Sequence, residues 1–198
     1  FTKADAHIFM THEQIEQYLL GVINMIDKFV PDMHYQSIYR IDYENLYNKG
    51  IRLIIFDLDN TIAPLDASVA AKEATELMAK IREMGITPVL MSNSGRERVT
   101  AFRNSLVIDS CANARKPFSK KYFKIMKLYD RTPEQIACVG DQLLTDVYGA
   151  NRLNMTSILV NPMSKKDRKI TYVNRVIEKV LFFIMDKRDI FKRGKYYE

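Results

Sequence analysis

Residues 51–61 read Ile-Arg-Leu-Ile-Ile-Phe-Asp-Leu-Asp-Asn-Thr, an apolar run that ends in two carboxylates, Asp57 and Asp59. Side chains two positions apart in a strand point to the same side, so these two carboxylates should project together where the strand ends. Like charges held this close repel each other, and the usual compensation is a metal ion or a shared proton. The stretch therefore predicts a buried strand that leads into a chemically active pair.

Strands and helices are predicted to alternate from this stretch to about residue 160. Apolar runs predict strands at Ile51–Asp57, Ile86–Ser92, Leu106–Ser110, Gln135–Gly140 and Thr156–Val160. The patterns between them predict helices at Ala67–Met84, Arg96–Asn104, Ser119–Tyr129 and Leu144–Arg152. This alternation is typical of an α/β fold, Rossmann-like, with a doubly wound parallel five-stranded sheet.

A segment flanks the predicted core, residues 50–162, on each side. Residues 1–49 are predicted to form an N-terminal helical segment, with an amphipathic helix at Glu13–Val30 and a short helix at Asp42–Asn48 that Asp42 caps. The chain between these two helices is predicted to be irregular. We therefore expect this segment to add helices beside the core.

The C-terminal segment, residues 163–198, is predicted to be a basic amphipathic helix and tail. The helix spans Lys166–Met185, and one face carries Val173, Val176, Ile177, Val180 and Ile184. A stripe of this kind usually packs on a core, so we expect it to pack on its own domain or on a partner subunit. Membrane contact is the alternative.

The net charge of +6 lies entirely in that C-terminal segment, which holds 11 Lys and Arg against 5 Asp and Glu. Such asymmetry favours an anionic partner, either a membrane surface or, less readily, nucleic acid. Only two cysteines are present, which excludes a disulfide framework. No apolar run approaches the ~20 residues of a membrane span. We therefore expect a cytoplasmic protein, with a peripheral position on the inner membrane face as a further possibility.

Polar residues follow the other predicted strands as well. Ser92-Asn93-Ser94-Gly95 follows the second strand, Arg115-Lys116-Pro117 follows the third, and Gly140-Asp141 follows the fourth, with Asp146 five residues on. Parallel α/β sheets bind ligands beyond the carboxyl ends of their strands, so these groups should converge. A sheet order of 3-2-1-4-5 would set the first strand beside the fourth and let Asp57 and Asp141 share one cation.

These residue types suit phosphate chemistry on a hard cation. Carboxylates hold Mg²⁺, which prefers oxygen ligands, and hydroxyl and ammonium groups hold phosphoryl oxygens. A carboxylate such as Asp57 can attack phosphorus to form an aspartyl-phosphate. A second carboxylate such as Asp59 can protonate the leaving oxygen and then activate water.

The chain resembles the haloacid dehalogenase-like (HAD) phosphatases. The resemblance covers roughly residues 50–160 and rests on four motifs in order: Asp57-Leu58-Asp59-Asn60-Thr61, Ser92, Lys116, and Gly140-Asp141 with Asp146. It implies that Asp57 is the nucleophile and a Mg²⁺ ligand, and that Asp59 is the general acid and base whose backbone carbonyl also binds the metal. It also implies that Asp141 is the other direct protein ligand.

The resemblance implies further roles around these aspartates. Ser92 and Lys116 would hold the phosphoryl group with Asn93, and Lys116 would offset the charge of Asp57. Asp146 would support the water shell of the metal, or else cap the next helix. Thr61 would touch the phosphate or stabilise its own turn.

The spacing of the motifs predicts an enzyme without a cap domain. Only one helix and one strand fit between Thr61 and Ser92, and again between Ser92 and Lys116. The site should therefore be open, which suits bulky substrates whose phosphate projects into a cleft.

The segment before the first motif is similar to that of subfamily IIIA, a branch similar to the phosphatidylglycerophosphate phosphatases. It contains Pro31-Asp32, Ser37-Ile38-Tyr39, Ile41-Asp42 and Lys49-Gly50-Ile51. A lipid substrate would also suit the basic C-terminal segment and its aromatic residues Phe182, Phe183, Phe191, Tyr196 and Tyr197. The alternatives are a phosphatase of sugar, nucleotide or protein phosphate, and a non-catalytic protein that docks on RNA or membrane. The oligomeric state stays open.

Overall fold

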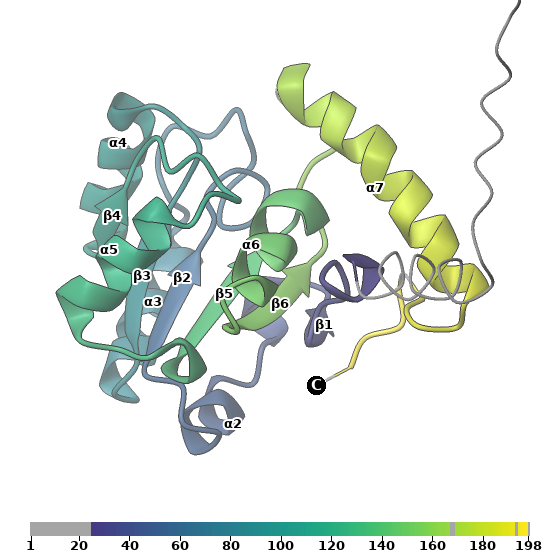
Figure 1. Cartoon of the computed structure of the whole chain (residues 1–198). Coiled ribbons are helices and arrows are strands. Elements are labelled where there is room, and N and C mark those ends of the chain that lie inside the picture. Colours follow the sequence, from purple (N-terminus) through teal and green to yellow (C-terminus); the bar gives the residue numbers. More distant parts are fainter. Residues whose placement is uncertain (1–24, 167–168, 193, 198) are drawn as a thin grey trace, which may run out of the picture.

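The apolar run at residues 51–56 forms the central strand of a parallel sheet. The computed structural model describes residues 25–166, 169–192 and 194–197. Its sheet has six strands in the order β1-β6-β5-β2-β3-β4, and all neighbours are parallel (Figure 1). The strands are β1 (Met33–Tyr35), β2 (Leu53–Phe56), β3 (Thr87–Met91), β4 (Asp109–Cys111), β5 (Ile136–Gly140) and β6 (Thr156–Val160).

The predicted order of the five core strands is confirmed, and β2 lies beside β5 as expected. The predicted number of strands is wrong, because β1 adds a sixth at the edge beside β6. The three residues of β1 carry no alternating pattern long enough to predict a strand, and their pairing partners lie more than a hundred residues away. The third predicted strand is displaced, because Leu106 still belongs to the preceding helix.

Helices cover both faces of the sheet. They include α2 (Tyr43–Asn48), α3 (Lys72–Glu83), α4 (Arg96–Leu106), α5 (Lys120–Tyr129), α6 (Tyr148–Asn151) and α7 (Lys169–Lys187). Short turns of helix are η1 (Ile38–Arg40), η2 (Pro133–Gln135) and η3 (Leu143–Val147), and η3 is a π-helix that runs into α6. Asp42 caps α2 as predicted, since its carboxylate accepts a hydrogen bond from the backbone N–H of Asn45.

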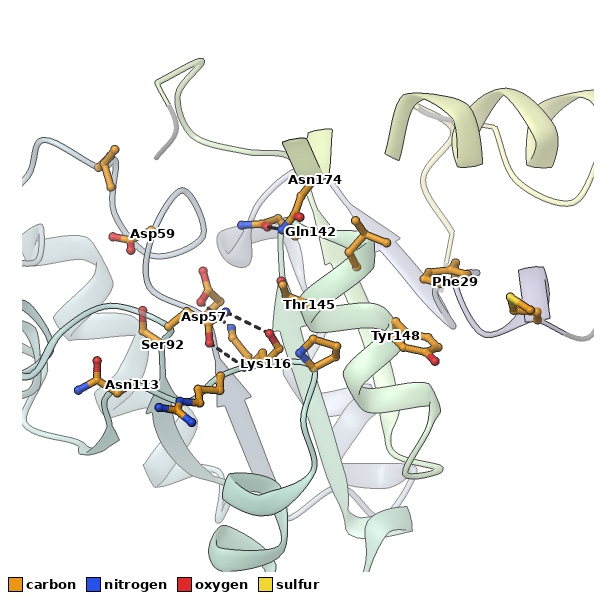
Figure 2. Close-up of a pocket in the computed structure, with 16 residues that line it drawn as sticks. Phe29, Asp57, Asp59, Ser92, Asn113, Lys116, Gln142, Thr145, Tyr148 and Asn174 are labelled. Carbon is orange, nitrogen blue, oxygen red and sulfur yellow. Dashed lines mark hydrogen bonds and ion pairs between the residues drawn. The ribbon is translucent and has the colours of Figure 1, made fainter. Parts of the chain in front are cut away.

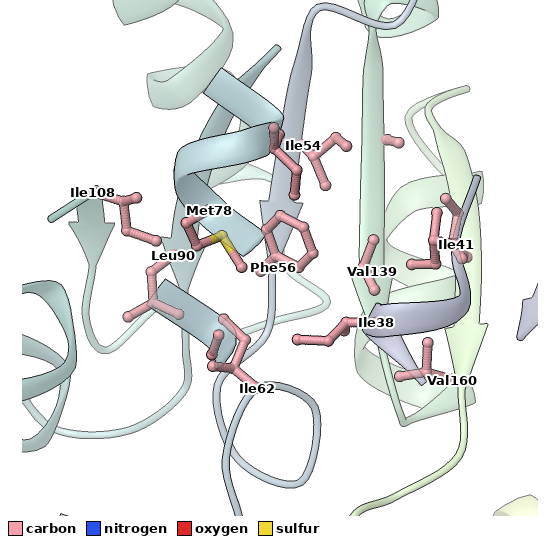
Figure 3. Close-up of a cluster of buried hydrophobic side chains, with 14 of the residues drawn as sticks. Ile38, Ile41, Ile54, Phe56, Ile62, Met78, Leu90, Ile108, Val139 and Val160 are labelled. Atoms are coloured by element: carbon pink, nitrogen blue, oxygen red, sulfur yellow. The ribbon is translucent and has the colours of Figure 1, made fainter. Parts of the chain in front are cut away.

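Alternate residues of β2 point into two separate hydrophobic clusters. Ile54 and Phe56 pack with residues of α2, α3 and α4 on one face (Figure 3). Leu53 and Ile55 pack with residues of α5 and α6 on the other face. All four side chains are buried, as expected for a central strand of a parallel sheet. The strand that ends at the candidate site is therefore fixed from both sides.

No lid domain stands over this end of the sheet in the described ranges. The chain between Thr61 and Ser92 forms α3 and β3, and the chain between Ser92 and Lys116 forms α4 and β4. These are the single helix and strand that the motif spacing predicts.

Helix α7 packs on the core through a different face from the predicted one. Leu181, Phe182 and Met185 face inward and contact Leu143 of η3, Leu159 of β6 and Phe191. The predicted stripe instead faces solvent, with Val173, Val176, Ile177 and Val180 each about half exposed or more. The two sides of α7 are thus both apolar, and periodicity alone cannot tell which one is buried.

Most of the predicted helix Glu13–Val30 lies outside the described residues, and only Met25 onward can be compared. In the described chain, no helix has the length and apolar character needed to cross a membrane.

Candidate active site

Asp57 directly follows β2, and its side chain is buried at the carboxyl end of the sheet. Its backbone N–H donates to the carbonyl of Val139 at 2.9 Å, which continues the pairing of β2 with β5. The chain then turns sharply at Asn60, whose φ of 65° is a left-handed value that Asn tolerates better than most residues. This turn places Asp59 at the mouth of the same pocket as Asp57 (Figure 2).

Three carboxylates form a cluster near the end of β2. Asp57, Asp141 and Asp146 are all buried, and each offers an oxygen that lies within 4.8 Å of the others. Asp59 does not join this cluster through its side chain. Its carboxylate is held by Arg98 Nε at 2.7 Å and by the hydroxyl of Ser94. The sequence therefore predicts the cluster but not the separate setting of Asp59.

The approach of Asp146 to β5 depends on a glycine. A Cβ at Gly140 would lie 2.2 Å from Cγ of Asp146, closer than any real contact. Asp146 itself lies in the π-helical turn η3, where its backbone N–H donates to the carbonyl of Gln142 at 3.1 Å. Single π-turns are rare and occur often at functional sites. Gly140 thus leaves room for Asp146, so that one loop brings the carboxylates of Asp141 and Asp146 close together.

Lys116 lies between two of these carboxylates. Its ammonium donates to Asp57 Oδ1 at 2.6 Å (Figure 2) and to Asp146 Oδ1 at 2.5 Å, and the side chain is almost fully buried. Asn93 fixes the backbone of Lys116, since its amide oxygen accepts from the Lys116 N–H at 2.7 Å and its amide nitrogen donates to the Lys116 carbonyl at 3.3 Å. Asn93 therefore positions Lys116 as well as lining the pocket.

Burial dominates the electrostatics of these carboxylates. Burial raises the pKa of Asp57 to about 7, although Lys116 opposes the shift. Burial likewise raises the pKa of Asp141 well above its ordinary value, against the pull of Arg175. Burial alone would lower the pKa of Lys116, but Asp146 and Asp57 outweigh it and raise that pKa. Buried acids of this kind favour the binding of a cation.

The donor set fits a hard divalent cation. Three buried carboxylates with converging oxygens would leave strong repulsion if all were ionised, and Lys116 and Arg175 together supply only two positive charges. Mg²⁺ takes oxygen ligands and keeps part of its water shell, so a small carboxylate cluster beside an open pocket suits it.

The remaining predicted residues lie at the same place. Ser92 is buried and lines the pocket, and its hydroxyl accepts from the backbone N–H of Ser94 at 3.0 Å. Thr61 is buried too, and its hydroxyl donates to Asp141 Oδ1 at 3.3 Å. Thr61 thus contacts the carboxylate cluster rather than lining the pocket, which favours a structural role over phosphate contact.

The pocket has a volume of about 850 Å³ and two different sides. Asn93, Asn113 and Arg115 form a polar side, whereas an apolar side is formed by Met25, Phe29, Leu144 and Tyr148. The rings of Phe29 and Tyr148 stack with centroids 4.6 Å apart. Figure 2 shows these two rings together at one side of the pocket, away from Asp57 and Lys116.

Sequence reasoning missed two arginines at the site. Arg98 of α4 binds Asp59, and also donates to the carbonyls of Ala67 at 2.6 Å and Pro64 at 3.2 Å. Arg175 of α7 binds Asp141. Although it belongs to the basic C-terminal segment, its side chain is only 19% exposed. Neither arginine belongs to a motif, and only the folded chain brings them to the aspartates.

Comparison with known proteins identifies the relatives of this chain. A family model described as Mitochondrial PGP phosphatase matches residues 16–163. The curated protein "Probable phosphatase YqeG" of Bacillus subtilis is 34% identical over 160 residues, which cover 81% of this chain and 93% of that protein. A threonine--tRNA ligase of Clostridium novyi is 69% identical over 29 residues, but these make up only 5% of the ligase. So short a match assigns no activity.

Solved structures that are similar to this chain include two phosphatases. The cobalt-bound deoxy-D-mannose-octulosonate 8-phosphate phosphatase of Haemophilus influenzae has a TM-score of 0.46 at 15% identity, over 72% of this chain and 94% of its own. The D,D-heptose 1.7-bisphosphate phosphatase of B. bronchiseptica, complexed with magnesium and phosphate, has a TM-score of 0.45 at 20% identity, over 55% and 80%. Likeness at this level assigns neither substrate nor metal.

Proposed function

The chain belongs to the PGP phosphatase family of HAD-like phosphatases, and we propose that it hydrolyses a phosphate monoester with Mg²⁺ through an aspartyl-phosphate on Asp57. The observation that carries this proposal is the buried cluster of Asp57, Asp141 and Asp146 with Lys116 between two of them. An ordinary acidic surface patch would be solvated, whereas this one is buried at the end of the sheet.

In the first step, the Asp57 carboxylate attacks phosphorus and the bond to the leaving oxygen breaks. Asp59 at the pocket mouth gives its proton to that oxygen. Lys116 and Ser92 stabilise the charge on the phosphoryl oxygens. Bound Mg²⁺, held by Asp57, Asp141, the Asp59 carbonyl and, through water, Asp146, would neutralise charge on the phosphoryl group and on its ligands.

In the second step, Asp59 takes a proton from water, which attacks the aspartyl-phosphate and releases inorganic phosphate. Asp59 suits both steps because its carboxylate lies at the pocket mouth, apart from the cluster. Arg98 and Ser94 hold this carboxylate in the free protein. Substrate must compete with that contact for Asp59.

The proposed substrate is phosphatidylglycerophosphate, a lipid with a terminal phosphate monoester. The family match supports this choice, and so does the apolar side of the pocket that also contains the reactive residues. The lack of a lid domain in the described chain leaves room for a bulky lipid. Sugar, nucleotide and protein phosphates remain the alternative substrates.

Phosphate release from a panel of substrates tests this function. With Mg²⁺, the full chain should hydrolyse phosphatidylglycerophosphate in mixed micelles with a kcat/KM at least about tenfold above that for glycerol phosphate, a sugar phosphate, a nucleoside monophosphate or a phosphopeptide. A higher kcat/KM for any of the other substrates would reject phosphatidylglycerophosphate as the substrate but not the phosphatase activity. No Mg²⁺-dependent release from any substrate, together with salt-sensitive RNA binding, would favour the non-catalytic alternative.

We further propose that the outer face of α7 contacts an anionic membrane surface, on the cytoplasmic side of the inner membrane. This outer face consists of Tyr172, Val173, Val176, Ile177, Val180 and Phe183, all between 46% and 62% exposed. Exposed apolar residues in a continuous row usually mark an interaction site. Lys179, Lys187 and Arg188 are exposed on the same helix or just after it and would attract anionic lipid.

Not all of the aromatic residues expected at that surface can reach it. Phe191 is 2% exposed, and Phe182 and Tyr197 pack against the cluster around Met185. They were expected at the interface because the sequence does not show that the tail folds back to pair Tyr197 with His34. Phe183 and Tyr196 remain exposed, at 62% and 45%.

Vesicle binding tests the outer face of α7. The protein should bind vesicles that contain phosphatidylglycerol but not neutral phosphatidylcholine vesicles. The double variant Val180→Asp with Phe183→Asp should bind at least about 100-fold less, because each buried apolar side chain contributes ~1.5–3 kcal/mol and the two together ~3–6 kcal/mol. Val69→Asp, equally exposed elsewhere at 60%, is the matched control. Equal binding of the double variant and the control would exclude α7 as the contact.

A further inference from the structure

We propose that Arg175 and Glu178 of α7 are positioning residues of the metal site, so that the C-terminal helix is a working part of the active site. Arg175 would fix the one orientation of Asp141 that receives the cation, and Glu178 would fix Arg175. This inference rests on the proposed role of Asp141 as a metal ligand.

One guanidinium holds Asp141 at two points. Nη2 of Arg175 forms an ion pair with Oδ2 of Asp141, and Nη1 donates to the backbone carbonyl of the same residue at 2.9 Å. The Asp141 side chain is 0% exposed. A planar, rigid group that contacts both the side chain and the backbone of one residue restricts its χ and ψ angles together. Oδ2 is thereby engaged, and the other oxygen, Oδ1, accepts the longer bond from Thr61 at 3.3 Å.

Glu178 links α7 to the loop that carries Asp141 and Asp146. Its Oε2 accepts from Arg175 Nη1 at 2.9 Å, and its Oε1 lies 3.4 Å from the backbone N–H of Leu144 in η3. Glu178 is 2% exposed, and burial raises its pKa against the pull of Arg175. A buried acid on a helix is costly unless it is paired. Here one partner, Leu144, belongs to the loop that carries Asp141 and Asp146, and the other, Arg175, holds Asp141.

Arg175 does not line the pocket that contains Asp57, Ser92 and Lys116. It contacts Asp141 from another side, where Asp141 also borders a second cavity. A direct phosphate-binding role is therefore not supported by its position. Residues that hold a metal ligand in place, without touching the metal, typically contribute about 10–100-fold to metal affinity.

The start of α7 is tied to the other side of the site as well. The side-chain amide of Asn60, in the turn after Asp59, donates to the carbonyl of Lys166 at 2.9 Å, and the backbone N–H of Met163 donates to the carbonyl of Asn60 at 2.9 Å. The segment that leads into α7 thus contacts the first motif, and α7 contacts the fourth. This explains why a helix outside the motifs lies against the metal ligands.

Mg²⁺ binding by the full chain, measured by titration calorimetry, tests the inference. Arg175→Ala should raise the Kd for Mg²⁺ by about 10–100-fold, and Arg175→Lys should give an intermediate value because it keeps the charge but not the two-point contact. Glu178→Ala should weaken binding less than Arg175→Ala. With an aryl phosphate, Arg175→Ala should recover most of its kcat at saturating Mg²⁺, because the residue positions a ligand and takes no part in the chemistry.

Val176→Ala, next to Arg175 but 62% exposed, is the matched control for the helix itself. Its Kd for Mg²⁺ should equal that of the unmodified protein. Unchanged Mg²⁺ binding in both Arg175 variants, with native circular dichroism, would overturn the inference. So would an equal loss in Val176→Ala. If the unmodified protein binds no Mg²⁺, the proposed function fails instead, and the two failures are thereby told apart.

Discussion

Replacing Asp57 with Asn should lower kcat for phosphate release by about 10⁴-fold or more at saturating Mg²⁺. The amide keeps the size of the side chain at the end of β2, so the packing around it should survive. It cannot act as the nucleophile, and no aspartyl-phosphate can form on it. The measurement is phosphate release from an aryl phosphate and from phosphatidylglycerophosphate.

Two further variants define what that loss means. Asp130→Asn, an exposed carboxylate at the end of α5, should keep full activity and is the matched control. Asp59→Asn should still take up phosphate from an aryl phosphate, whose leaving group needs no acid, but should release it slowly because Asp59 activates the water. Intact-protein mass spectrometry should then find the phosphorylated form in Asp59→Asn and not in Asp57→Asn. Full activity of Asp57→Asn would reject the assigned nucleophile.

Much of the fold follows from local pattern in this chain. Strands β2, β5 and β6 are apolar runs with both faces buried, and a run of this kind is enough to predict a strand from the sequence. Strand β1 cannot be predicted in this way, because its three residues form a strand by pairing with β6, which lies far along the chain. The buried face of α7 was predicted wrongly for a related reason. Both sides of this helix are apolar, and packing against Leu143 and Leu159 in other elements determines which side is buried.

The candidate site divides in the same way. Residues that directly follow strands, such as Asp57 and Asp141, are predictable because strand ends converge at one edge of a parallel sheet. Arg98 and Arg175 are not, since each reaches its aspartate from a helix whose placement depends on tertiary packing. Arg175 and Glu178 are three positions apart on a helix. In the sequence, such a pair looks the same as an ion pair on the surface of any helix. Only burial distinguishes it.

Replacing Lys116 with Met should abolish most activity and destabilise the metal-free protein by about 3–5 kcal/mol near neutral pH. Lys116 is the cation between Asp57 and Asp146, and its loss leaves buried carboxylates without compensation. Activity should fall by about 10²–10³-fold, because the ammonium also stabilises charge on the phosphoryl oxygens. Thermal unfolding and phosphate release measure the two effects, and Lys124→Met, exposed on α5, is the control.

The pH dependence of this loss distinguishes charge from packing. The pKa of Asp57 is raised to about 7 in the folded protein, above its ordinary value of 3.8, so its contribution to stability is present at low pH and is lost as pH rises through about 7. Without Lys116 the carboxylates are still harder to ionise, so the deficit in Tm should be larger at pH 8 than at pH 5.5. Added Mg²⁺ should narrow it, because the cation replaces the missing positive charge. A deficit that is the same at both pH values and insensitive to Mg²⁺ would mean that Lys116 acts through packing, and that the carboxylates around it do not form a cation site.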